Sequence, residues 1–293
     1  MRYRVKHITE YQYAGRVSHC YNMAHLMPRN CQRQQCISSQ LDILPGSAFN
    51  VRREDYYGNW AHHFEIHQPH KVLKIVATSD VETRTQASVI DLELGVTCGQ
   101  AREMMATSRD SDTLLAREFL LDSPMVSVND ELKNYAAPFF ADDKPLMTAV
   151  KDLTAAIYRD FKYSPASTTV ATPINEVMQT RAGVCQDFAH VQIGCLRAMG
   201  FAAKYVSGYL ETLPPPGQPK MVGTDASHAW LSVYAPGEGW FEFDPTNNCI
   251  AAEQHIITAW GRDYFDVTPL CGVIFGGGKQ PLLSVSVDVM RLT

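Results

Sequence analysis

A chain of 293 residues, 45% of them hydrophobic and 19% charged, is long enough for one large or two modest domains and has ample apolar surface for a folded core. Its formal net charge of -5 and its lack of any Lys/Arg block exclude an electrostatic nucleic-acid surface, so we expect no nucleic-acid partner. We also expect a cytoplasmic protein without membrane contact. No apolar run approaches the roughly 20 residues that cross a bilayer, and the first residues alternate like a strand.

The first predicted elements are strands in which apolar and polar residues alternate. They span about residues 4–13, 36–44, 50–57, 60–67 and 71–82. The step Tyr57-Gly58-Asn59 is typical of a hairpin turn, because Gly and Asn tolerate positive φ. We therefore expect an N-terminal antiparallel β-sandwich over residues 1–95.

Helical spacing of apolar residues begins near Gly99 and predicts helices over about residues 99–122, 130–136 and 145–161. Thr172-Pro173 predicts the start of a short helix, and a further helix begins at about Cys185 and ends at Gly200. Strands are predicted over residues 203–210, 227–234, 240–244 and 282–292. The whole is an α+β chain, with a second domain expected over residues 96–293.

Eight cysteines lie far apart and form no CxxC pair, so neither a disulfide scaffold nor a zinc ribbon is expected: Cys20, Cys31, Cys36, Cys98, Cys185, Cys195, Cys249 and Cys271. Cys185 differs from the others because it follows a Gly closely and lies in the first turn of a predicted helix. Unpaired amides and the helix dipole favour a thiolate at that position. An isolated cysteine there is more often a buried apolar residue, so the interpretation depends on partners.

The partners come from a predicted hairpin whose closing pair is Tyr234 and Trp240. In this register His228 and Asp244 lie on the same face as diagonal neighbours, about 7 to 8 Å apart at the backbone. An imidazole and a carboxylate can close that span, whereas a slip of one residue would put them on opposite faces. The other face carries a core pattern: Ala229, Leu231, Val233, Phe241 and Phe243.

Three segments, RAGVCQDFAHVQIGCLRAMGFAAKYVSGYL, SHAWLSVYAPGEGWFEFDPTNN and HIITAWGRDYFDV, resemble the core of bacterial transglutaminase-like proteins, often described as cysteine proteases. HITEYQYAGRV, LMPR and YYGNWAHHFEIHQPHKVL resemble the N-terminal β region of that family. The resemblance implies a papain-like core in which a helix bearing the nucleophile packs on an antiparallel sheet. It also implies a catalytic triad at Cys185, His228 and Asp244.

The predicted function is cysteine-dependent acyl transfer on carboxamide or peptide bonds of a peptide or protein substrate, through a thioester on Cys185. Hydrolysis is slightly favoured over transamidation, because nothing in the sequence identifies an amine-acceptor site. Two alternatives stay open: a peptide-binding module without turnover, and an arylamine-type acyltransferase. We expect no metal and no cofactor, and the sequence leaves the oligomeric state open.

Several neighbouring residues are assigned no catalytic role. Gln186 and Asp187 are expected to cap or pack the helix, and His190 to point away from the site. The cluster His62, His63, His67 and His70 lacks a completing ligand pattern for a metal. Three tryptophans and the stretch after Gly261 are possible pocket residues: Trp230, Trp240, Trp260, Arg262, Asp263 and Tyr264.

Overall fold

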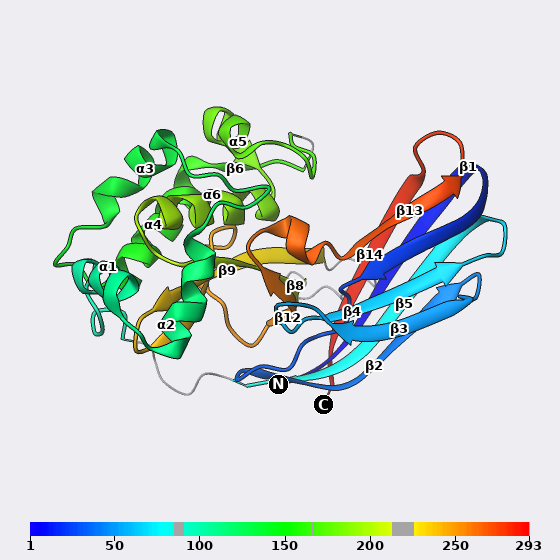
Figure 1. Ribbon diagram of the computed structural model, residues 1–293, viewed down its shortest axis with the longest axis horizontal. Helices are drawn as coiled ribbons and strands as arrows, with labels where there is room; N and C mark the ends of the chain where they lie inside the picture. Colours follow the sequence, from blue (N-terminus) through cyan, green and yellow to red (C-terminus); the bar gives the residue numbers. More distant parts are fainter. Residues whose placement is uncertain (85–90, 166, 213–225, 293) are drawn as a thin grey trace, which may run out of the picture.

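The computed structural model describes residues 1–84, 91–165, 167–212 and 226–292. Long strands form one lobe, and helices packed against a shorter sheet form the other, which gives the predicted α+β fold (Figure 1). The two ends of the chain lie side by side in the β lobe, because Arg2 pairs with Leu292. Within the described residues, no helix combines the length and apolarity that crossing a membrane requires.

The β lobe is built around one long strand that serves two half-sheets. Its strands are β1 (Arg2–Ala24), β2 (Gln34–Leu44), β3 (Phe49–Glu54), β4 (Trp60–Ile66), β5 (His70–Thr83), β13 (Leu270–Gly276) and β14 (Leu282–Leu292). The first part of β1 lies between β5 and β14, and its last part lies between β4 and β13. The register with β5 shifts between Gln12 and Val17, where β1 passes from one half to the other.

Apolar side chains from both halves meet in one core. Val17 and Cys20 of β1 pack there with Phe64 of β4 and with Leu73 and Ile75 of β5. Every one of them is 1% exposed or less. Strict alternation along β5 places Leu73, Ile75 and Ala77 on the same face, as the period of two in the sequence predicts. The sandwich expected for the N-terminal region is confirmed.

The expected domain division needs a correction at its C-terminal end. Strands β13 and β14 pair along β1, so residues 270–292 belong to the β lobe and not to the second domain predicted over residues 96–293. The alternation in residues 282–292 identified a strand, but a strand pattern does not name its partner. Here the partner is the first strand of the chain, which would otherwise leave its hydrogen-bonding edge unpaired.

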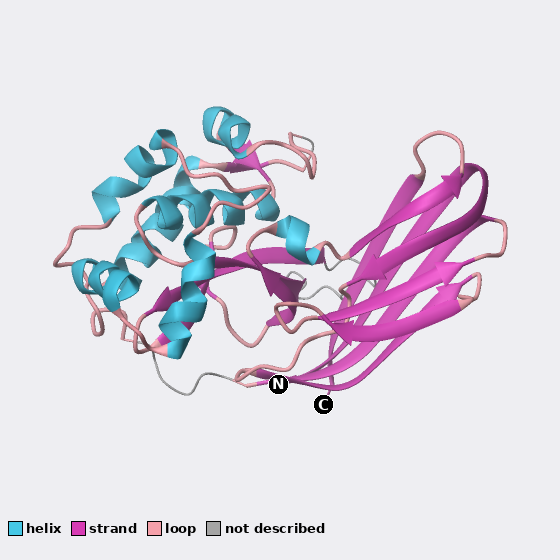
Figure 2. Cartoon of the chain, in the orientation of Figure 1, coloured by secondary structure: helices cyan, strands magenta, loops and turns pink. Residues whose placement is uncertain are grey.

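The second lobe contains a five-stranded antiparallel sheet in the order β11-β10-β9-β8-β12. Its strands are β8 (Ala203–Leu210), β9 (Ala226–Ala235), β10 (Gly239–Asp244), β11 (Cys249–Ile250) and β12 (His255–Gly261). Helices cover one side of this sheet (Figure 2). They are α1 (Cys98–Thr107), α2 (Ser111–Ala116), α3 (Asp130–Ala136), α4 (Leu146–Asp160), α5 (Ile174–Thr180) and α6 (Cys185–Ala198), with the short helices η1 (Arg117–Leu120), η2 (Ala137–Phe139) and η3 (Tyr264–Val267). A two-stranded parallel pair, β6 (Lys162–Tyr163) and β7 (Ala182–Gly183), precedes α6.

Helix α6 is the centre of this lobe, and its residues from Gln186 to Arg197 are all buried. A helix that is covered on all sides must be apolar or have its polar groups paired. Phe188 and Val191 pack in the core with Leu231 and Val233 of β9, so the predicted apolar face of the hairpin is the one that meets the helices. Gly200 follows the helix with φ +84, the left-handed conformation predicted for a residue that ends a helix.

Three features differ from the elements predicted from the sequence pattern. The helix expected over residues 99–122 is three pieces, because the Asp110 side chain accepts hydrogen bonds from the amides of Asp112 and Thr113 and starts a new helix there. Strands β12 and β13 were not predicted at all. The short helix α5 begins at Ile174, one residue later than expected.

Candidate active site

Cys185 is the first residue of α6, and its side chain is partly exposed. The preceding residue, Val184, is extended, and its amide donates to the Asp187 carboxylate at 2.8 Å. Thr168 donates to the same carboxylate oxygen at 2.7 Å. A Cβ added to Gly183 would lie 2.6 Å from that oxygen, so only a glycine lets the chain pass so close to the cap. Asp187 therefore has the capping role expected for it, and the cap places Cys185 at the helix end where backbone amides are unpaired.

His228 and Asp244 come from adjacent strands of the predicted hairpin. The observed register pairs Trp240 with Tyr234 and Phe243 with Leu231, as predicted from the sequence. His228 Nε2 lies 2.7 Å from Asp244 Oδ2. With Nε2 directed at the carboxylate, Nδ1 is the ring nitrogen left to face Cys185, which lines the same cleft and acts on the charge of His228. The structure thus brings the three predicted residues together.

Asp244 is completely buried and surrounded by donors. Its Oδ1 accepts from the backbone amides of Thr246 and Asn247 at 2.9 and 3.2 Å. Its Oδ2 accepts from His228, from the Asn247 side-chain amide at 2.7 Å and from His255 Nε2 at 3.1 Å. Burial alone would raise the pKa of this carboxyl, but the hydrogen bonds from both imidazoles lower it well below its usual range. Asp244 is therefore a carboxylate at any pH at which the protein works.

The charge on Asp244 controls His228. Burial by itself lowers the pKa of this imidazole, but its hydrogen bonds to Asp244 and Cys185 raise it well above the ordinary value. His228 is accordingly protonated at neutral pH when the sulfur beside it carries the compensating negative charge. A protonated imidazole beside a sulfur atom stabilises its thiolate form, which is the nucleophilic form of cysteine.

With this geometry established, comparisons with known proteins identify the family. Residues 3–82 match the bacterial transglutaminase-like N-terminal region, and residues 133–245 match the transglutaminase-like superfamily. An uncharacterised protein of Mycobacterium tuberculosis is 42% identical over 99% of this chain and 92% of its own length. The chain belongs to the bacterial transglutaminase-like proteins. Both resemblances seen in the sequence are thereby confirmed.

Two further proteins are similar to this chain, one over its whole length and one over a part of it. The crystal structure of a Cytophaga hutchinsonii protein described as a candidate cysteine protease superimposes with a TM-score of 0.75 at 21% identity, over 100% of this chain and 92% of that one. At that identity it establishes the shared fold. A protein-glutamine gamma-glutamyltransferase of Pseudomonas aeruginosa is 32% identical over 32% of this chain and 15% of its own length. At the level of the family, this transglutaminase-like chain is a cysteine-dependent enzyme.

His255 is the site residue that sequence reasoning missed. It is 1% exposed, and its Nδ1 accepts from the backbone amide of Ala252 at 3.2 Å. Because an amide can only donate, Nε2 must carry the ring proton and donate it to Asp244. Burial lowers the pKa of His255, so it is a neutral donor beside a charged carboxylate. The segment HIITAWG was already part of a family motif, and a histidine that opens an apolar run must find a buried partner.

Among the described residues, one group has side-chain atoms close enough together to bind a metal ion: His228, Asp244 and His255. Their ligand atoms all lie within 4.8 Å of one another. The spacing has another explanation here. Both Nε2 atoms are directed at the same carboxylate oxygen, and the Nε2 of His255 carries a proton, so neither is turned toward a shared external point. The arrangement is that of a hydrogen-bonded network centred on Asp244. The four N-terminal histidines set aside on sequence grounds do not belong to this group.

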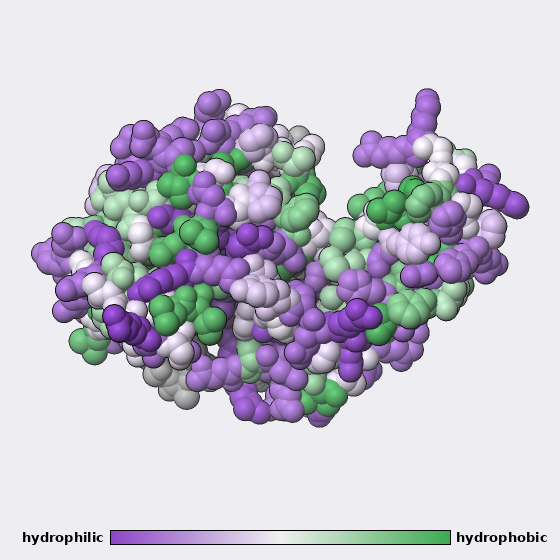
Figure 3. Space-filling view, in the orientation of Figure 1, coloured by the Kyte–Doolittle hydropathy of each residue, from purple (hydrophilic) through white to green (hydrophobic). Residues whose placement is uncertain are grey.

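A cleft of about 260 Å³ gives access to Cys185 and His228. One wall comes from the helical lobe and includes Gln186, Tyr205 and Tyr264. The opposite wall comes from the β lobe, through Thr9, Tyr11, Leu270, Leu283 and Val285. In the space-filling view a notch separates the two lobes, with apolar surface on both of its sides (Figure 3).

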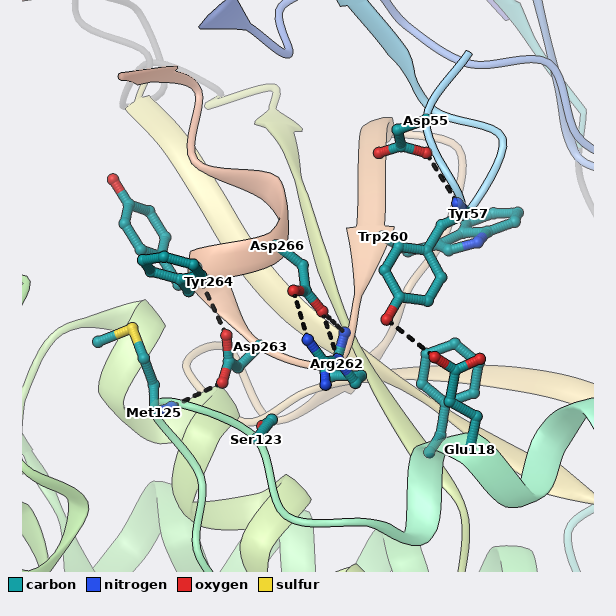
Figure 4. A network of polar contacts seen from close by, with 12 residues as sticks. Asp55, Tyr57, Glu118, Ser123, Met125, Trp260, Arg262, Asp263, Tyr264 and Asp266 are labelled. Atoms are coloured by element: carbon teal, nitrogen blue, oxygen red, sulfur yellow. Dashed lines mark hydrogen bonds and ion pairs between the residues drawn. The ribbon is translucent and has the colours of Figure 1, made fainter. Parts of the chain in front are cut away.

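The remaining residues considered from the sequence have structural partners. His190 Nε2 accepts from the amide of Tyr264 at 3.2 Å, and burial lowers its pKa to about 4. Asp263 accepts from the amide of Met125 at 2.7 Å, and Arg262 forms a two-pronged ion pair with Asp266 at 2.9 Å on each side. Figure 4 shows both contacts as dashed lines. These bonds hold the segment that delivers Tyr264 to the cleft.

The tryptophans divide between two places. Trp230 is fully buried and stacks with the His228 ring at 5.9 Å between centroids, while its Nε1 donates to Glu242 at 2.6 Å. Trp240 and Trp260 lie elsewhere, on either side of the Lys204 ammonium at 4.1 and 3.8 Å. Trp230 therefore supports the imidazole from behind, and the other two do not line the cleft that holds Cys185.

Proposed function

We propose that this protein is an acyl-transfer enzyme that breaks carboxamide or peptide bonds through a thioester on Cys185, with His228 as its acid and base and Asp244 as the group that orients His228. The observation that carries the proposal is the hydrogen-bonded His228–Asp244 pair beside a cysteine at the first turn of α6. These are the requirements of an activated thiol: a base within reach and a third group that holds the base in one tautomer.

In the first half of the reaction the Cys185 thiolate attacks the carbonyl carbon, and the C=O electron pair moves to the oxygen. The backbone N–H of Cys185 at the start of α6 is the natural donor for that oxyanion, and one such donor contributes roughly 3 to 4 kcal/mol to known oxyanion holes. His228 Nδ1–H then protonates the departing nitrogen as the C–N bond breaks. The products of this half are an amine or ammonia and the acyl thioester.

In the second half an incoming water or amine attacks the thioester while His228 takes its proton, and the Cys185 thiolate leaves. Hydrolysis remains our preferred outcome, because neither the sequence nor the described part of the cleft lining identifies an amine-acceptor site. Transamidation has one specific support, since the aligned portion of the Pseudomonas aeruginosa relative belongs to a protein-glutamine gamma-glutamyltransferase. A peptide or protein substrate is proposed in both cases, and the proposed location is the cytoplasm.

The experiment is mass-spectrometric trapping of an acyl adduct after incubation with a library of glutamine-containing peptides, with and without a primary amine such as putrescine. We expect a mass increase confined to the peptide that carries Cys185. Replacement of one ammonia by one water in the glutamine side chain of the substrate would indicate hydrolysis, whereas incorporation of the amine with release of ammonia would indicate transamidation.

The matched control is another partly exposed cysteine on a different lobe. Cys36→Ala removes such a thiol from β2 and should leave the adduct and the turnover intact, whereas Cys185→Ala should abolish both. Peptides that bind the unmutated protein and Cys185→Ala equally, with no adduct at any time point, would replace the enzyme by the peptide-binding module.

A further inference from the structure

One face of the β1/β14 strand pair runs from the junction between the lobes into the active-site cleft. The register pairs His7 with Val287, Thr9 with Val285 and Tyr11 with Leu283. Directly paired residues of antiparallel strands project to the same side, and so do residues two apart along a strand. This face therefore presents Thr9, Tyr11, Leu283 and Val285 together, and all four line the cleft.

The same face is anchored to the helical lobe farther along both strands. Tyr3 and Val5 of β1 and Val287 and Val289 of β14 are buried against Tyr209 and Ile256 of the second sheet. His7 Nδ1 lies 3.1 Å from the Tyr209 hydroxyl, and Arg291 pairs with Glu211 at 2.8 Å. The wall is thus held at a fixed position opposite Cys185, because the strands that form it are also the junction between the lobes.

Among the residues that the structure describes, the cleft lining carries no charge apart from the reacting pair. None of the cleft residues in the described part of the chain is Asp, Glu, Lys or Arg. Burial lowers the pKa of His7 to about 4, so this histidine is neutral and pairs with Thr9 at 2.8 Å. A charged substrate group entering here would lose water without meeting a counter-charge, which is unfavourable.

The outer part of the wall leaves apolar side chains uncovered. Leu283 is 56% exposed and Val285 is 50% exposed, although both face the cleft. Covering such side chains with an apolar group is favourable, since it removes their surface from water. The cleft, about 260 Å³, lies just below the range of roughly 300 to 1,000 Å³ typical of ligand pockets, so it suits one side chain and its flanking backbone.

We propose that the β-lobe wall, defined as Thr9, Tyr11, Leu270, Leu283 and Val285, makes the enzyme selective for acyl donors that carry an uncharged apolar or aromatic group next to the reacting carboxamide. The proposal rests on the proposed function, because it assigns the substrate class of the same cysteine. The helical lobe then supplies the chemistry, and the β lobe supplies the selectivity. Acidic and basic neighbours of the carboxamide are rejected by the same surface.

The test compares two alkylating probes that share the same benzyl chloroacetamide framework and differ in one charged group, N-benzyl-2-chloroacetamide and its para-carboxylate analogue. Both form a C–S bond with Cys185 and release chloride, and the labelling rate of each is measured on the peptide that carries Cys185. The ratio of the two rates, divided by the same ratio for the urea-unfolded chain, reports the cleft alone. We expect a ratio of at least about tenfold in favour of the benzyl probe, since one methylene in an apolar pocket alters selectivity by roughly 10- to 200-fold.

Two lysine substitutions sharpen the test. Val285→Lys places an ammonium in the wall and should bring the ratio to about one or reverse it. Val273→Lys is the matched control, because Val273 is a similarly exposed valine, 60% exposed, on β13 and outside the cleft lining. It should keep the ratio of the unmutated protein.

Two results would overturn the proposal, and they differ in meaning. A ratio near one in the folded protein, or a ratio that Val285→Lys and Val273→Lys change equally, refutes the selectivity while rapid labelling of Cys185 still supports the enzyme. Labelling of Cys185 by both probes no faster than in the unfolded chain refutes the activated thiol itself, and the proposed function falls with it.

Discussion

The substitution Asp244→Asn tests the electrostatic core of the site most directly. The asparagine oxygen can still accept the hydrogen bonds from the backbone amides of Thr246 and Asn247. Its NH₂ group then stands in the place of Oδ2, which accepts three hydrogen bonds in the unmutated protein. The Asn247 side chain can turn to accept, but His255 cannot, because the amide of Ala252 occupies its Nδ1. One buried donor is then orphaned at a cost of about 1–3 kcal/mol, and the His228 imidazolium loses its counter-charge. We expect a total loss of about 3 kcal/mol in the free energy of unfolding.

The same change should disable the base. Facing an NH₂ group, His228 must accept at Nε2 and carry its proton on Nδ1, so it can no longer take a proton from Cys185 as a neutral ring. The equivalent change in a Ser-His-Asp triad lowers kcat by about 10⁴-fold. Alkylation of Cys185 by iodoacetamide between pH 5 and 9 provides the readout. The unmutated protein should react rapidly down to pH 6, whereas Asp244→Asn should react slowly at pH 6 and faster only at alkaline pH, as a thiol without an activating base does.

A matched control separates stability from chemistry. Asp263 is another completely buried aspartate that accepts from two backbone amides, those of Met125 and Phe265, and does not contact the reacting pair. Asp263→Asn should therefore lower the free energy of unfolding without changing the pH profile of Cys185 alkylation. Rapid alkylation of Asp244→Asn at pH 6 would refute the assignment of Asp244 as the group that keeps His228 protonated.

Three other substitutions test separate parts of the structure. His255→Phe removes one of five donors to Asp244 and should lower kcat for peptide-amide turnover by about 10- to 100-fold. His255→Gln should restore part of this activity, because its side-chain amide can donate to Asp244. Equal activity of the Phe and Gln variants would contradict a donor role. Burial lowers the pKa of Lys204 to about 7 in the folded protein, against about 10.4 in the unfolded chain. Burying the charged form therefore lowers the free energy of unfolding by its full amount below pH 7 and not at all above pH 10.4. The gain in unfolding free energy from Lys204→Met should therefore grow, by up to about 1.4 kcal/mol per pH unit, as pH falls from 10 to 7, and a pH-independent difference would contradict this. Arg197 donates to the carbonyls of Phe119, Ala203 and Arg262 and to Ser123 Oγ, so Arg197→Met should cost about 3–5 kcal/mol in urea unfolding, and an unchanged midpoint would show that these bonds contribute little.

The geometry of the candidate site could be predicted because it depends on local structure. The turn between β9 and β10 fixes the register of that hairpin, and an apolar face that must meet the core excludes a slip of one residue. The cap of α6 is equally local, since Gly183, Val184 and Asp187 lie within five positions. Cys185, His228 and Asp244 could therefore be placed from patterns that each span fewer than twenty residues.

His255 escaped prediction because its position depends on a long-range pairing. β12 pairs with β8, about fifty residues earlier, and its register shifts between Ile257 and Ala259. An irregular strand at a sheet edge shows no clean alternation, so the pattern in HIITAWG does not distinguish a strand from a buried helical segment. Only the folded sheet shows that its first residue reaches Asp244.

The β-lobe wall also depends on a long-range pairing that the sequence pattern does not show. Periodicity in residues 282–292 shows that Leu283, Val285 and Val287 share a face, but it cannot say what that face meets. What this face meets is decided by the pairing of β14, near the C-terminus, with β1, near the N-terminus. This pairing places Leu283 beside Tyr11, and both line the cleft opposite Cys185. In the proposed function, the reacting residues thus lie in short contiguous motifs, whereas the residues proposed to select the substrate lie where β1 pairs with β14. Substitutions in residues 7–11 or 283–285 should therefore alter which carboxamide reacts, and substitutions around Cys185 and His228 should alter whether any carboxamide reacts.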